Sequence, residues 1–365
     1  MEHPLPRTRE LIEQGIARRL HLGAQLYVSQ DGQTLADFAV GESRPGVPMS
    51  TDTINQWMSS GKPLTAMAIL QLWERGRLKL DDRVSQHVPE FGVKGKERIT
   101  IRHLLTHTGG FRAVVGLKWD DPWDAAIAKV CNAPLEPRWE IGRSAGYHAS
   151  SSWYMLGEIV RRIDGRRIDL YLHEELFNPL GMQDCWLGIP TDEQARYGNR
   201  MGLMLDTAGD SPKPVDPGSS TGDAAAVRPG ANLRGPIRAL GRFYETLLRG
   251  GLSGVIGPQA VEAMCARHRA GLMDQTFKAV IDMGLGLIVN SSYYSGEPPP
   301  YGYGARAEIR AFGHSGQVSS CGFCDPDAGL VVAWVCNGMP EEPAGQRRQH
   351  EMNTAIYDDL GPFLV

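Results

Sequence analysis

Ser59 and Lys62 lie three positions apart in the stretch WMSSGKPLTA, which opens a helix-forming run. In a helix, residues i and i+3 share a face, so the Lys62 amine can reach the Ser59 hydroxyl. The free backbone N–H groups of a helix N-terminus also favour negative charge on the serine oxygen. A serine needs a base to act as a nucleophile, and a desolvated lysine with a lowered pKa can be that base. The pair indicates acyl transfer, although serine at a helix start is more often only an N-cap.

A second candidate stretch is FGHSGQVSS, which contains His314, Ser315 and Gly316 and leads into a strand-like run. Its GHSGQ does not fit the G-x-S-x-G pattern of a nucleophile elbow, because Gln317 occupies the position of the last glycine. We therefore do not expect this stretch to carry a nucleophile of its own.

Two patterns that suggest metal or redox chemistry are incomplete. HEELF, at 173–177, lacks the second histidine of a zinc-protease helix. Cys321 and Cys324 have no second CxxC and no histidine pair to complete four zinc ligands. We expect buried free thiols, and neither a metal nor a cofactor is predicted.

The apolar pattern predicts strands at both ends of the chain and helices between them. Residues 24–42 alternate on both sides of Asp31-Gly32, the strongest short signal of a β-hairpin. Further strands are predicted near the C-terminus, at 284–290, 307–312, 317–324 and 330–335. Helical spacing predicts helices at 4–20, 59–76, 100–107, 121–131, 150–164, 167–177, 236–250, 258–269 and 346–360.

These elements predict an α/β fold of the α+β sandwich type, with an antiparallel sheet formed by both termini and flanked by helices. Residues 1–80 and 226–365 would form the sandwich domain. Residues 81–225 would form an inserted all-helical subdomain. The segment 205–232, which crosses the boundary at 225, is rich in Gly, Pro, Asp and Ser and is predicted to form a long irregular loop over the surface.

Composition restricts the partners. The 365 residues are 42% hydrophobic and carry a net charge of −4, with basic residues scattered along the chain, so a nucleic-acid partner is not expected. No apolar run reaches the ~18 residues of a membrane span. The charged, amphipathic N-terminus differs from a secretory signal, and a cytoplasmic location is expected.

Several stretches together resemble the serine β-lactamase-like superfamily, in the branch of class C β-lactamases, serine D,D-peptidases and family VIII esterases. They follow one another in the family's order over about 55–340 and read TINQWMSSGKPLTAMAILQL, LKLDDRVSQHVPEF, ITIRHLLTHTGGF, YMLGEIVRRIDG and LFNPLGMQDC. The resemblance implies an α/β sandwich with an inserted helical domain, which agrees with the apolar pattern.

The resemblance also implies roles for individual residues. Ser59 would attack a carbonyl and Lys62 would take its proton. His314 would hold positive charge or a hydrogen bond near Lys62, and Gly316 would let the strand pass close to substrate. Ser315, in the same motif, and Ser150 are also expected at the substrate. The backbone N–H groups of Ser59 and Gln317 would form the oxyanion hole.

The family's Y-x-N motif aligns with IGRSAGYHASSSWYMLGEIV in two registers. Tyr147 takes the tyrosine position in one and His148 in the other. Either side chain could relay a proton, since a tyrosine beside two cations has a lowered pKa and histidine titrates near neutrality. The family's asparagine becomes Ala149 or Ser150, and its loss argues against β-lactamase activity.

The predicted function is cleavage of a small-molecule ester through an acyl group on Ser59, without metal or cofactor. Alternatives are a transacylase that passes the acyl group to an amine or alcohol in antibiotic biosynthesis, a β-lactamase or D,D-peptidase, and a non-catalytic penicillin-recognising module. Partners would be a small-molecule acyl donor and possibly such an acceptor. Some further side chains either line the cleft or pack beside it: His107, Trp119, Trp123 and Trp139.

Overall fold

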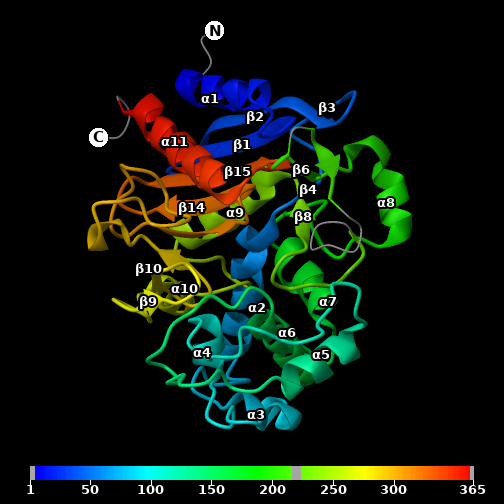
Figure 1. Ribbon diagram of the computed structural model, residues 1–365, viewed down its shortest axis with the longest axis vertical. Helices are drawn as coiled ribbons and strands as arrows, with labels where there is room; N and C mark the ends of the chain where they lie inside the picture. Colours follow the sequence, from blue (N-terminus) through cyan, green and yellow to red (C-terminus); the bar gives the residue numbers. More distant parts are fainter. Residues whose placement is uncertain (1–4, 210, 216–222, 362–365) are drawn as a thin grey trace.

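The computed structural model describes residues 5–209, 211–215 and 223–361, and an eight-stranded antiparallel sheet forms its centre (Figure 1). The strand order is β11-β12-β13-β14-β15-β1-β2-β3. The N-terminal hairpin pairs with β15 near the C-terminus, which confirms that both ends of the chain build one sheet. The strands are β1 (Gly23–Gln30), β2 (Gln33–Arg44), β3 (Val47–Pro48), β11 (Asp282–Met283), β12 (Ile288–Val289), β13 (Phe312–Gly316), β14 (Ser320–Asp325) and β15 (Leu330–Cys336).

Side chains alternate between the two faces of the sheet along each strand. Both faces of the central strands β1, β14 and β15 are buried. On β15, Val332 and Trp334 pack under α1 and α11, whereas Val331 and Val335 pack against α9. The sheet therefore lies between two helical layers, with α1 and α11 together on its upper side in Figure 1. The helices packed around it are α1 (Pro6–Ala17), α2 (Lys62–Glu74), α9 (Ile237–Leu248), α10 (Pro258–Cys265) and α11 (Glu342–Leu360).

The chain between α2 and α9 is mainly helical, and α3 to α6 are drawn below the sheet in Figure 1, with α8 to the right. The helices of this lobe are α3 (Val84–His87), α4 (Ile101–Leu105), α5 (Trp123–Asn132), α6 (Ser151–Asp164), α7 (Ile168–Leu172) and α8 (Thr191–Tyr197). The same part of the chain also forms the short strands β5 (Trp186–Leu187), β6 (Leu205–Asp206), β7 (Lys213–Pro214) and β8 (Leu233–Gly235). The lobe is thus not wholly helical, and the boundaries at 80 and 225 stay a prediction.

Four more short strands lie outside the lobe: β4 (Asn55–Gln56), β9 (Met273–Asp274), β10 (Ala279–Val280) and β16 (Gly338–Met339).

Helix α2 joins the sheet to this lobe. Every residue from Lys62 to Leu72 is buried, and a helix that is apolar on all sides belongs in the centre of a domain. Its side chains share one continuous core with α6 and α9. A residue at the N-terminus of α2 consequently lies where the sheet and the lobe meet.

Several predicted elements were wrong in extent. The segment 307–312 forms no strand before Phe312, and residues 317–319 form a turn before β14. Of the strand predicted at 284–290, only β12 forms, because the Leu285 N–H bonds the Met264 carbonyl at the end of α10 instead of a neighbouring strand. The helix predicted from residue 4 starts at Pro6, and residue 4 itself lies outside the described residues, as do 210 and 216–222 of the predicted excursion.

The thiols of the CxxC stretch do not form a pair. Cys321 and Cys324 are buried free cysteines, and they belong to the cores on opposite faces of the sheet. Among the described residues, none of the helices combines the length and apolar character needed to cross a bilayer.

Candidate active site

Ser59 lies in a single 3₁₀ turn, Met58–Gly61, that leads directly into α2. The preceding residue, Met58, has a φ of 49°, a left-handed conformation that costs free energy for a side chain of its size. This turn places the Ser59 Oγ 2.9 Å from the Lys62 Nζ. The i, i+3 spacing in the sequence therefore corresponds to a direct contact between hydroxyl and amine.

The Lys62 amine is fully buried, with 0% of the residue exposed. In the described part of the chain it has no carboxylate partner. It donates to the Gly230 carbonyl and lies 5.3 Å from the ring centres of both Tyr147 and Trp153. Burial lowers the pKa of Lys62 well below that of an ordinary lysine. An uncharged amine at this position has a lone pair that can accept the Ser59 proton.

Tyr147 is the second polar group at Ser59, and its phenol hydrogen-bonds the serine hydroxyl. Burial raises the pKa of Tyr147, so the expectation of a lowered pKa was wrong. The reason is that neither neighbour is a stable cation, since burial also favours the neutral forms of Lys62 and His314. The phenol keeps its proton and can donate it.

His148 is held by the main chain. Its Nε2 accepts hydrogen bonds from the N–H groups of Gly110 and Phe111, at 3.0 and 3.2 Å. Its Nδ1 lies 2.7 Å from the Gly146 carbonyl, to which it donates. Burial lowers the pKa of His148 to about 4, so the ring is neutral and both nitrogens are occupied. Of the two registers, the structure brings Tyr147 and not His148 to Ser59.

Strand β13 contains His314, Ser315 and Gly316, and because side chains alternate along a strand, the side chains of His314 and Ser315 point to opposite faces of the sheet. His314 lies on the side of Tyr147, with ring centres 5.9 Å apart. Ser315 points to the other side, where its hydroxyl accepts from Gln349 and donates to the Tyr301 carbonyl. The prediction of a Ser315 side chain at the substrate was therefore wrong, because neighbouring strand residues face opposite ways.

His314 does not supply the positive charge that we expected. Burial, together with the nearby Lys62, lowers the pKa of His314 to about 3. Its Nδ1 donates to the Ser315 carbonyl at 2.8 Å, and in the described part of the structure its Nε2 has no hydrogen-bond partner. A neutral imidazole beside Lys62 leaves the amine free of a competing charge.

Gly316 lets β13 approach the nucleophile turn. A methyl group on Gly316 would lie 2.5 Å from the Trp57 carbonyl and 2.7 Å from the Met58 Cβ. Close passage to Ser59's own turn, more than passage to substrate, is what requires glycine here. Ser320 on β14 secures the same turn by donating to the Trp57 carbonyl at 2.6 Å.

Gln317, the second residue of the expected oxyanion hole, is exposed in the turn after β13. The pairing of its N–H with that of Ser59 stays a prediction.

The remaining candidates lie around the site or pack beside it. Ser150 precedes α6, where its carbonyl accepts the first helical N–H groups, and its side chain makes no capping bond. His107 lies 4.7 Å from the Tyr147 ring, measured between centres. Trp123 and Trp139 have packing roles, with indoles bonded to Glu158 and to the Thr108 carbonyl.

The residues that hold Tyr147 in place were not predicted from the sequence. Asp274 accepts the Tyr147 N–H at 3.1 Å and forms a buried ion pair with Arg269 at 3.0 Å. Phe277, from the same β9–β10 hairpin, packs its ring 4.9 Å from that of Tyr147. No motif in residues 270–280 indicates a functional site, because Asp274 and Phe277 reach Tyr147 only in the folded structure.

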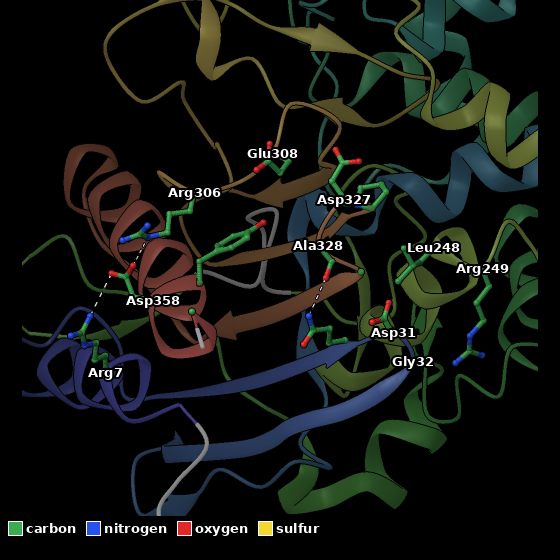
Figure 2. Close-up of a pocket in the computed structure, with 15 residues that line it drawn as sticks. Arg7, Asp31, Gly32, Leu248, Arg249, Arg306, Glu308, Asp327, Ala328 and Asp358 are labelled. Carbon is green, nitrogen blue, oxygen red and sulfur yellow. Dashed lines mark hydrogen bonds and ion pairs between the residues drawn. The ribbon is translucent and has the colours of Figure 1, made fainter. Parts of the chain in front are cut away.

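A surface cavity lies away from Ser59 (Figure 2). It has a volume of about 900 Å³ and lies near the β1–β2 turn and the ends of α1 and α11. Figure 2 shows Arg7 and Arg306 directed at Asp358, with which both form ion pairs. These cations are largely exposed and already paired, so the cavity is a surface hollow without a catalytic constellation.

The comparisons with known proteins decide the family. A family model described as Beta-lactamase matches residues 8–355. The chain belongs to this family. It is 27% identical over 345 residues to "Esterase/beta-lactamase LipL" of Mycobacterium tuberculosis, covering 87% of this chain and 77% of that protein. It is 30% identical over 209 residues to "Esterase EstB" of Burkholderia gladioli, covering 51% of this chain and 52% of EstB.

Solved structures of the beta-lactamase fold agree over nearly the whole chain. A penicillin-binding protein homologue from Caulobacter crescentus has a TM-score of 0.78 at 30% identity and covers 98% of both chains. A family VIII carboxylesterase has a TM-score of 0.78 at 25% identity, also with 98% of both chains covered. "EstCE1, a hydrolase with promiscuous acyltransferase activity" has a TM-score of 0.82 at 20% identity, which shows the shared fold.

Lys62 should control the acid side of the pH profile. Only the neutral amine can take the Ser59 proton, so the acylation rate should rise with pH through a midpoint well below the ordinary pKa of lysine. Lys62→Arg keeps a positive charge that cannot be lost, and it should reduce acylation by at least ~10³-fold. Stopped-flow acylation from pH 5 to 10 measures both. A flat profile with an active arginine variant would exclude Lys62 as the base.

Tyr147 and His148 should differ in what their loss affects. Tyr147→Phe should slow acylation by ~10²-fold or more with little change in stability, because it removes one donor. His148→Ala should lower the free energy of unfolding by about 2 kcal/mol or more, because two buried N–H groups lose their acceptor. Urea unfolding and single-turnover kinetics on both variants separate the effects. Full activity in Tyr147→Phe would contradict the relay.

Proposed function

We propose that the chain cleaves a small-molecule ester through an acyl group on Ser59. The observation that carries the proposal is the 2.9 Å contact between the Ser59 hydroxyl and a fully buried amine, for which the described residues provide no counter-ion. Such an amine accepts a proton from the serine far more readily than an exposed lysine does. This substrate class is supported by LipL, described as an esterase/beta-lactamase, and by EstB, described as an esterase.

Acylation proceeds in balanced steps. Lys62 takes the proton as the Ser59 oxygen attacks the ester carbonyl, and the N–H groups of Ser59 and Gln317 receive the oxyanion. When the tetrahedral intermediate collapses, the C–O bond to the leaving alcohol breaks. Tyr147 gives its proton to that oxygen, and the Lys62 ammonium returns a proton to Tyr147. The product is the free alcohol and an acyl ester on Ser59, with Lys62 neutral again.

Deacylation runs the same steps in reverse with a new nucleophile. Water, an alcohol or an amine loses its proton to Tyr147 and Lys62 while attacking the acyl carbon, and the proton returns to the Ser59 oxygen. The pair of groups serves both halves, so transfer to an alcohol or amine needs no further residue. A β-lactam is a less suitable donor because Ala149 follows His148 where the family motif has asparagine.

The acyl group should be found on Ser59 by mass. Intact-mass spectrometry, quenched early after mixing with 4-nitrophenyl butyrate, should show an added butyryl group that is absent in Ser59→Ala. Ser315→Ala is the matched control, because its hydroxyl faces away from the site and the adduct should persist. No adduct with any activated ester or β-lactam would reject an acyl-enzyme and favour a non-catalytic binding module.

The acceptor can be identified from product partition. Deacylation should be followed with and without an added primary alcohol or amine at equal ester turnover. Transfer predicts that the fraction of new ester or amide rises with acceptor concentration while free acid falls. An unchanged yield of free acid at every acceptor concentration would restrict the enzyme to hydrolysis.

A further inference from the structure

Arg228 is a buried cation beside the catalytic centre that the chemistry above does not use. Only 2% of the residue is exposed, and its guanidinium carbon lies 5.1 Å from the ring centre of Trp119. The phenol of Tyr154, on α6, also adjoins it. Stacking on an aromatic face is a favoured setting for arginine and leaves its N–H edge available for a partner.

Within the described residues that edge has no anionic partner. None of the three side-chain nitrogens of Arg228 meets an acceptor at full hydrogen-bond geometry there, and the Tyr154 phenol is the polar side chain that interacts with the guanidinium. By comparison, buried Arg269 pairs with Asp274, and buried Arg348 donates to main-chain carbonyls. Keeping a guanidinium dry and unpaired is costly, so a site of this kind suits a bound anion.

Arg228 lines a cavity of about 230 Å³. The walls include both indoles of the 119–123 loop and the methyl groups of neighbouring alanines, so part of the surface is apolar. Arg167 also lines it but is already bonded to Asp169. The cavity is further lined by the carboxylates Asp120, Asp121 and Asp223, of which Asp121 is paired with Lys129. These acids disfavour a doubly charged phosphate and leave room for a single negative charge, which points to a carboxylate.

The chain links this cavity to Ser59's base. Two residues after Arg228, the Gly230 carbonyl accepts from Lys62, and between them the Pro229 carbonyl accepts from Thr65 at 3.0 Å. Two residues span at most about 7 Å. The main chain at Arg228 therefore lies within about 7 Å of the residue whose carbonyl accepts from Lys62.

We propose that Arg228, stacked on Trp119, binds the carboxylate of a small acidic molecule, the acyl donor of the Ser59 reaction. The identification of the ligand as acyl donor rests on the proposed esterase or acyltransferase function. The carboxylate site itself does not. Trp119 covers the face of the guanidinium, and the N–H edge forms two parallel bonds to the carboxylate.

Binding tests the site without catalysis. Glutarate is titrated by calorimetry into the Ser59→Ala chain and into the same chain carrying Arg228→Gln or Arg167→Gln. Both glutamine changes remove one charge from the same cavity, but only Arg228→Gln should weaken glutarate binding, raising the Kd by at least ~10-fold. Arg228→Lys, which keeps the charge and lacks the fork, should be intermediate and guards against misfolding of the glutamine variant. No glutarate binding, or an equal loss in both glutamine variants, would overturn the proposal.

Kinetics tests the link to Ser59. The acidic 4-nitrophenyl hemiglutarate is compared with its neutral methyl ester, which has the same acyl chain. Arg228→Gln should reduce kcat/KM at least ~10-fold for the acidic ester and leave the neutral ester unchanged. Equal effects on both esters would overturn the assignment to the acyl donor. If neither ester is cleaved while glutarate still binds through Arg228, the proposed function fails and the carboxylate site stands.

Discussion

The burial of one amine without a counter-ion is the constraint on which the site depends. Among the described residues, an ammonium at Lys62 is bonded by the Gly230 carbonyl and the Ser59 hydroxyl and by no carboxylate, and its burial favours the neutral amine. The neighbouring groups follow from this choice. Tyr147 retains its proton and His314 stays uncharged, since each is desolvated by the same enclosure. A carboxylate beside the lysine would make its ammonium stable and remove the base.

The enclosure comes from three parts of the chain that are distant in sequence. Helix α2 brings Lys62 into the core, the loop before α6 brings Tyr147, and the edge of β13 closes the third side with His314 and Gly316. The strained Met58 and the absent side chain of Gly316 are where these parts meet most closely. Since close-packed interiors yield little, the turn of Ser59 has one arrangement available.

Local patterns in the sequence predicted what depends on local geometry. The contact of Ser59 with Lys62 follows from helical spacing, and the β1–β2 hairpin follows from Asp31-Gly32, both of which adopt positive φ. The opposite orientation of Ser315 was available from the two-residue period of a strand. The choice between Tyr147 and His148 was not, because it depends on the N–H groups of Gly110 and Phe111, which capture the imidazole. The roles of Asp274, Gly230 and Arg228 depend on tertiary contacts, which no residue spacing in the sequence predicts.

The neutral histidines around the site have a consequence for tolerance of acid. His148 and His314 have pKa values lowered to about 4 and about 3, and the pKa of His107 is lowered as well, all chiefly by burial. Below about pH 6.5 these rings become protonated in the unfolded chain but stay neutral in the folded chain, so lowering the pH favours unfolding. Each ring then removes about 1.4 kcal/mol of stability per pH unit until the folded ring itself titrates. The burial that turns a lysine into a base thereby also makes the folded protein less stable in acid.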